Sequence, residues 1–166
     1  MLEACHERVQ RSLALLIRVQ EYVQKNGVDD KAKSAVRDVL RYFDLAAPLH
    51  HQDEELHVFP ALMEQANSEL QKCVHDLQAQ HREMECGWGN MRKSLQKLLD
   101  WNAGDAGVRE VLSSGSVDAF FALYQSHIQL EEQMAYPAAQ SLLTPQHMEE
   151  MAADMMHRRG VKSKPL

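Results

Sequence analysis

Two stretches of the sequence repeat one pattern of histidine, glutamate and proline. Residues 50–62 read HHQDEELHVFPAL and residues 127–139 read HIQLEEQMAYPAA. At a constant offset they share the pairs His50/His127, Glu54/Glu131, Glu55/Glu132 and Pro60/Pro137, with an aromatic residue before each proline. Positions i and i+4 of a helix lie on one face, so in each copy the histidine and the first glutamate project together.

This combination of side chains is suited to binding metal ions. A neutral imidazole supplies a nitrogen ligand, and a carboxylate supplies two oxygens that can serve two different ions. Such donors favour iron, manganese or zinc over softer metals that prefer sulfur. One H-x-x-x-E motif is weak, because it also forms an ordinary polar pair on a helix. Two aligned copies predict a two-metal site.

Two other histidines are placed to complete such a site. His6 lies about 20 residues before the first predicted turn and His50 about 20 residues after it, so both reach the same height at roughly 1.5 Å per residue. His81 lies about 13 residues beyond the second predicted turn, close to the height of Glu54. The height of His127 is less constrained, because a long connection precedes its helix. Alone, either His6 or His81 would more often be a structural histidine.

The elements that must position these residues are predicted to be helices. Apolar residues recur with a period near 3.6, and no segment reads as a strand. The predicted helices cover about 2–25, 30–66, 68–101, 116–143 and 145–159. We therefore expect an all-α protein, an up-down-up-down four-helix bundle over about 2–143 with a short C-terminal fifth helix. Residues 1–166 are expected to form a single domain.

Several helix ends can be assigned from local chemistry. Gly27 should end the first helix in the left-handed conformation, and Asp29 or Asp30 should cap the second. Ser116 is expected to cap the fourth helix after the long connection 102–116. Thr144, followed by a proline, should cap the fifth.

Two prolines fall inside the predicted second helix. Pro48 and Pro60 lack the backbone N–H that an interior helical position uses. We expect them to bend or tighten this helix without ending it.

Composition limits the remaining function classes. The 166 residues carry a formal net charge of −6, which argues against nucleic acid as a partner. No apolar run approaches a membrane span, and the charged N-terminus does not resemble a secretory signal, so a cytoplasmic location is expected. The three cysteines are expected to be reduced. The basic tail at 157–166 is expected to be frayed and solvated.

The repeated motif and the two additional histidines resemble the hemerythrin-like family, also called the HHE cation-binding domain. The resemblance covers about 2–143 and implies a four-helix bundle with a non-haem di-iron centre. It implies that the terminal ligands are His6, His50, His81 and His127, and that Glu54 and Glu131 bridge the two ions beside an oxo, hydroxo or water ligand. Manganese or zinc is the alternative to iron.

One departure from the oxygen-carrying members bears on function. Those proteins have a fifth histidine, from H-x-x-x-H on the third helix, and an H-x-x-x-x-D motif on the fourth. Here the residues four positions from His81 are Leu77 and Glu85, and the last motif is H-x-x-x-E. The chain is more similar to the bacterial branch with four histidines and two glutamates, which is associated with iron-centre repair and nitric oxide. These differences argue against reversible oxygen carriage.

Several neighbours of the predicted ligands allow two interpretations of their role. His51 should point about 100° away from His50, as a surface group or one that supports the ligands. His57 returns to the face of His50 and is expected to be a supporting or core residue, with ligation as the alternative. Glu85 could replace the missing fifth histidine, although we do not favour this. Tyr124 is expected to be a core aromatic residue, with contact to the metal cavity as the alternative. Glu55 and Glu132 should point away from the metals.

These observations leave three functional hypotheses. In the first, a cytoplasmic di-iron protein binds, senses or detoxifies a small diatomic ligand, oxygen or nitric oxide, or handles iron for damaged iron centres. In the second, the chain is a di-iron oxidase or peroxidase, which requires an organic substrate pocket beside the metals. In the third, the metal is a structural element without redox function. A dimer is left open by the sequence.

Overall fold

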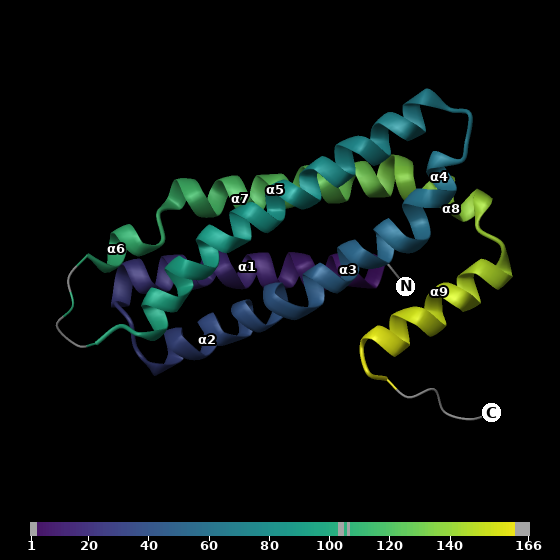
Figure 1. Cartoon of the computed structure of the whole chain (residues 1–166). Coiled ribbons are helices and arrows are strands. Elements are labelled where there is room, and N and C mark those ends of the chain that lie inside the picture. Colours follow the sequence, from purple (N-terminus) through teal and green to yellow (C-terminus); the bar gives the residue numbers. More distant parts are fainter. Residues whose placement is uncertain (1–2, 103–104, 106, 162–166) are drawn as a thin grey trace. The chain divides into compact units, whose positions relative to one another are not determined.

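The computed structural model describes residues 3–102, 105 and 107–161, and these ranges contain helices and connections but no strand (Figure 1). The α-helices are α1 Glu3–Asn26, α2 Asp30–Arg41, α3 Ala47–Asp53, α4 Phe59–Met63, α5 Ser68–Leu99, α6 Val108–Val111, α7 Ser114–Leu130, α8 Tyr136–Leu142 and α9 Pro145–Arg158. Three wider π-helical turns, η1 Tyr42–Ala46, η2 Glu54–Val58 and η3 Glu131–Ala135, interrupt them. The predicted all-α fold class with a short C-terminal helix is confirmed. The expected start of the first helix at residue 2 lies outside the described residues.

Most predicted helix ends are present. Gly27 has φ +80° and its N–H donates to the carbonyl of Val23, so it closes α1 as expected. The Asp29 carboxylate accepts from the N–H of Ala32 and caps α2. The Thr144 hydroxyl accepts from the N–H of His147 at the start of α9.

The connection before the fourth helix differs from the prediction. It contains the short helix α6, and α7 begins at Ser114, before the expected cap Ser116. The Ser116 hydroxyl donates to the carbonyl of Ser113, so Ser116 lies inside the first turn. Residues 103–104 and 106 of this connection lie outside the described part of the chain.

The three π turns explain how the helices accommodate proline. Each is followed by a residue whose N–H donates five positions back and then by a proline: Ala47 before Pro48, Phe59 before Pro60 and Tyr136 before Pro137. A proline ring in a regular α-helix clashes with the carbonyl four residues earlier, and a wider turn relieves this clash. The helix is therefore widened at these points, and the expectation that it tightens is wrong.

The described residues fall into two compact units. The first takes in the described residues of Met1–Pro48 and His81–Ser126, and the second those of Leu49–Gln80 and His127–Leu166. The boundaries fall inside α3, α5 and α7, so each of these helices contributes to both units. The prediction of one domain over 1–166 stays a prediction.

Aromatic side chains form the core of the first unit, in which α1 also packs along α2 (Figure 1). The ring of Phe43 lies 5.0 Å from that of Trp88, 5.4 Å from that of Phe120 and 5.6 Å from that of Tyr124, measured between centroids. Next to Phe43, the Asp44 carboxylate accepts from the indole N–H of Trp88 at 2.9 Å. The core thus joins the π turn η1 to α5 and α7.

In the second unit, α4 packs against α8, and α9 buries Met151 and Met155. Among the described residues, no helix is both long and apolar enough to cross a membrane.

Candidate metal centre

The two copies of the repeated motif place their histidine and glutamate side chains in the interior of the second unit. His50 lies on α3 and His127 on α7, and the glutamates Glu54 and Glu131 open the π turns η2 and η3. All four side chains are at most 3 % exposed. Residues of these types are rarely buried to this extent without a partner or a metal.

Within each copy, the i,i+4 spacing brings the imidazole to the carboxylate. His127 Nε2 lies 2.9 Å from Glu131 Oε1. His50 Nε2 lies 3.6 Å from Glu54 Oε1, which is an ion-pair distance and too long for a hydrogen bond. The local geometry predicted from the spacing is therefore present in both copies.

The fold also brings the two copies together. Donor atoms of His50, Glu54 and Glu131 lie within 4.8 Å of one another, and so do donor atoms of Glu54, His127 and Glu131. The two carboxylates belong to both sets. This arrangement can hold two cations that share the glutamates and are each bound by one imidazole.

The chemistry of these donors fits the predicted metals. Two ionised carboxylates buried at this separation repel each other, and cations between them offset that repulsion. Nitrogen and oxygen donors without a thiolate suit iron, manganese or zinc. The residues present therefore fit a di-metal site, while the identity of the metal is not fixed by them.

His6 and His81, the other two predicted ligands, belong to the first unit. Their exposed fractions are 2 % and 5 %, so both are buried as a ligand must be. Their membership of the ligand set stays a prediction.

Two polar side chains contact the predicted ligands of the second unit. Gln80 Oε1 lies 3.0 Å from His127 Nδ1. The Tyr136 hydroxyl donates to Glu54 Oε1, so the aromatic residue of one motif copy bonds to the carboxylate of the other. The equivalent residue of the first copy is Phe59, which has no hydroxyl group. The two copies are therefore not equivalent at this contact.

The end of the C-terminal helix contributes an ion cluster that was not predicted from the sequence. Asp53 is 0 % exposed and accepts from Arg158 Nη2 and Arg159 Nη2, each at 2.5 Å. The expectation of a frayed, solvated basic tail is wrong for these two arginines; residues 162–166 lie outside the described part of the chain. Arg158, the last residue of α9, and Arg159 directly after it thus balance the buried carboxylate next to Glu54. The only available signal was an aspartate inside the histidine-glutamate motif.

A second contact fixes α9 through His57. His57 Nε2 lies 2.7 Å from Asp154 Oδ2, which is not a predicted ligand, so the expected supporting or core role of this histidine stays a prediction. The contact with His57, followed by the bond from Arg158, lowers the pKa of Asp154 below its usual value. The π turn η2 is therefore tied to α9 through this contact.

The remaining neighbours mostly follow expectation. His51 is half-buried, and its ring centroid lies 5.8 Å from that of His127, so it is closer to the ligands than a surface residue would be. Glu85 is exposed, which does not favour ligation. Tyr124 packs in the aromatic core of the first unit, where burial raises the pKa of its hydroxyl. Glu55 and Glu132 are exposed, as expected.

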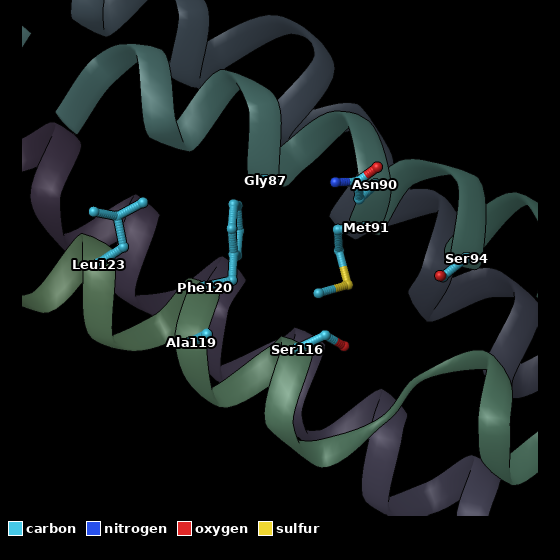
Figure 2. A pocket seen from close by; sticks show the side chains of 8 residues that line it. All are labelled: Gly87, Asn90, Met91, Ser94, Ser116, Ala119, Phe120 and Leu123. Carbon is cyan, nitrogen blue, oxygen red and sulfur yellow. The ribbon is translucent and has the colours of Figure 1, made fainter. Parts of the chain in front are cut away.

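A pocket in the first unit bears on the oxidase or peroxidase hypothesis. It has a volume of about 270 Å³ and lies between α5 and α7 (Figure 2). Its lining consists of Gly87, Asn90, Met91, Ser94, Ser116, Ala119, Phe120 and Leu123. These eight residues include neither a predicted ligand nor a titratable side chain. The pocket therefore does not supply the substrate site beside the metals that this hypothesis requires.

Comparison with known proteins identifies the family. Residues 1–139 match the model of the hemerythrin HHE cation-binding domain. A protein of Haemophilus influenzae, described as uncharacterized, is 32 % identical over 162 residues, which cover 98 % of this chain and 90 % of that protein. The buried histidine-glutamate sets are the kind of cation site that the family description names. The chain therefore belongs to the hemerythrin family of HHE cation-binding domains.

Proposed function

We propose that this protein binds two iron ions and uses them to bind, sense or detoxify oxygen or nitric oxide, or to handle iron for damaged iron centres. The observation that carries the proposal is the pair of buried glutamates shared by two sets of donors, one with His50 and one with His127. His6 and His81 are further terminal ligands in this proposal, on the basis of the sequence. The cytoplasm is the proposed location.

The residues have distinct tasks in this proposal. The imidazoles of His50 and His127 would each hold one ion, and Glu54 and Glu131 would be shared between the two ions. Iron supplies the redox chemistry and the affinity for a diatomic ligand when it is bound. The six proposed side chains leave coordination positions open, because two such ions have about ten to twelve positions in total.

Apolar side chains that lie near the predicted ligands in the sequence are buried, which is compatible with a small ligand. Val58, Phe59 and Leu62 on η2 and α4 are at most 1 % exposed, and Leu77 on α5 is fully buried. These apolar side chains limit the access of water to the second unit. A molecule of two atoms needs little space, whereas an organic substrate needs a cavity lined by catalytic groups.

The test is the visible spectrum of the iron-loaded, chemically reduced protein while oxygen is admitted and then withdrawn. Bands that vanish when oxygen is removed would show reversible binding, as in a carrier or a sensor. Bands that persist until reductant is added would favour redox, nitric oxide or iron-handling chemistry. A parallel titration with nitric oxide tests whether the centre binds that gas. A folded, metal-loaded protein whose spectrum responds to neither gas would refute the proposal and leave the structural-metal hypothesis.

A further inference from the structure

The contact between Gln80 and His127 determines how this histidine can bind a metal. The two ring nitrogens of an imidazole point in different directions, and each of them has an oxygen nearby here. Nδ1 lies 3.0 Å from the amide oxygen of Gln80, and Nε2 lies 2.9 Å from Glu131 Oε1. His127 itself is 1 % exposed, so water competes little for either nitrogen.

Both oxygens only accept hydrogen bonds and a neutral imidazole has one N–H to donate, so a hydrogen bond to Gln80 requires that proton on Nδ1. In the neutral imidazole, the lone pair is then on Nε2, on the side of the two carboxylates. A metal ion binds that lone pair. The Gln80 contact thus selects both the tautomer and the ring orientation that ligation requires.

We propose that Gln80 is a positioning residue that holds His127 with Nε2 available to the metal. This inference rests on the proposed metal-binding function and adds to it a residue that does not touch the metal. Hydrogen bonds of this kind raise the basicity of a ligating imidazole and fix its orientation, and their loss typically lowers metal affinity about 10–100-fold.

The experiment compares Gln80→Leu with Gln80→Glu. Leucine has a similar size but cannot accept a hydrogen bond, whereas a carboxylate accepts a stronger one. Gln78→Leu and Gln78→Glu are matched controls, since Gln78 is also half-buried on α5 but lies two positions away and points to another face. Metal affinity is measured by competition between the protein and a chelator, with Fe²⁺ and with Co²⁺.

We expect Gln80→Leu to bind Co²⁺ about 10–100-fold more weakly than the wild type. Gln80→Glu should bind at least as tightly as the wild type, and both Gln78 variants should match it. In the Co²⁺-loaded protein, the Nδ1–H of His127 should give a hyperfine-shifted NMR signal that exchanges slowly with solvent. That signal should be lost in Gln80→Leu and kept in Gln80→Glu, which a merely structural role of Gln80 does not predict.

Two outcomes would overturn the inference: a Gln80→Leu protein that binds metal like the wild type, or equal losses in Gln80→Leu and Gln80→Glu. A wild-type protein that binds no metal would instead refute the proposed function. In that case the exchange rate of the Nδ1–H of His127, measured without metal, still tests the Gln80 contact. The two failures are therefore distinguishable.

Discussion

Replacing Asp53 with alanine should destabilise the second unit strongly. The carboxylate is 0 % exposed and accepts hydrogen bonds from two arginines at the end of α9 and directly after it. The arginine side chains are only 15 % and 28 % exposed. Without Asp53, Arg158 and Arg159 lose their buried partner and must regain solvent by moving outward. Arg158 keeps its 2.8 Å contact with Asp154, which offsets part of this loss.

The magnitude follows from the type of contact. Breaking a buried ion pair by removing one partner costs about 3–5 kcal/mol. Because both arginines are partly exposed, we expect a loss of about 3 kcal/mol, at the lower end of that range. For a chain of this length, such a loss corresponds to a decrease in Tm of roughly 6–12 °C.

The assay is urea unfolding of the metal-free protein in the presence of a chelator, which excludes any contribution from metal binding. Arg41→Ala is the control, because Arg41 and Asp38 form an exposed pair with side-chain exposures of 71 % and 56 %. That variant should change stability by less than about 1 kcal/mol. Double-mutant cycles of Asp53→Ala with Arg159→Ala measure the coupling directly. If Asp53→Ala unfolds at the same urea concentration as Arg41→Ala, the assigned role of the cluster is wrong.

Three further predictions concern the predicted ligands and their neighbours. His127→Ala should lower metal affinity by on the order of tenfold or more, whereas His51→Ala should retain bound metal. The metal content of both variants is measured after dialysis, and equal losses would contradict the ligand assignment. Tyr136→Phe removes the hydroxyl that donates to the buried Glu54 and should cost about 1–3 kcal/mol in urea unfolding without metal. An unchanged midpoint would argue against this contact. The contact with His57 is the chief cause that lowers the pKa of Asp154 in the folded protein. The ionised Asp154 therefore stabilises the folded protein above its usual pKa of 3.8, and this stabilisation is lost as the pH falls below that value. Asp154→Asn should therefore reduce the fall in Tm between neutral pH and pH 3. An unchanged dependence of Tm on pH would refute this role of Asp154.

Short-range chemistry made much of this protein predictable from its sequence. The partners of a motif with i,i+4 spacing meet whenever the segment is helical, so the contacts of His50 with Glu54 and of His127 with Glu131 needed only the helix. The cap of α2 at Asp29 and the end of α1 at Gly27 depend on residues within a few positions. The fold class followed from hydrophobic periodicity, and the family from the repeated motif.

The π turns show where local reasoning was incomplete. The sequence placed Pro48 and Pro60 correctly inside a helical segment, but it did not specify how the helix would absorb the missing N–H groups. Both bends and wider turns relieve the same clash, and the choice depends on what the surrounding side chains pack against. In the second copy, Tyr136 directly follows the widened turn and precedes Pro137, and its hydroxyl reaches Glu54.

The supporting contacts of the candidate centre were decided by tertiary structure alone. Gln80 and His127 are 47 positions apart, Tyr136 and Glu54 are 82 apart, and Arg158 and Asp53 are 105 apart. No periodicity relates such residues, because their meeting depends on how separate helices pack and in which register. The sequence by itself therefore determined which side chains are candidates to bind metal, and the packing of the helices decided which neighbours contact those side chains and balance the charge beside them.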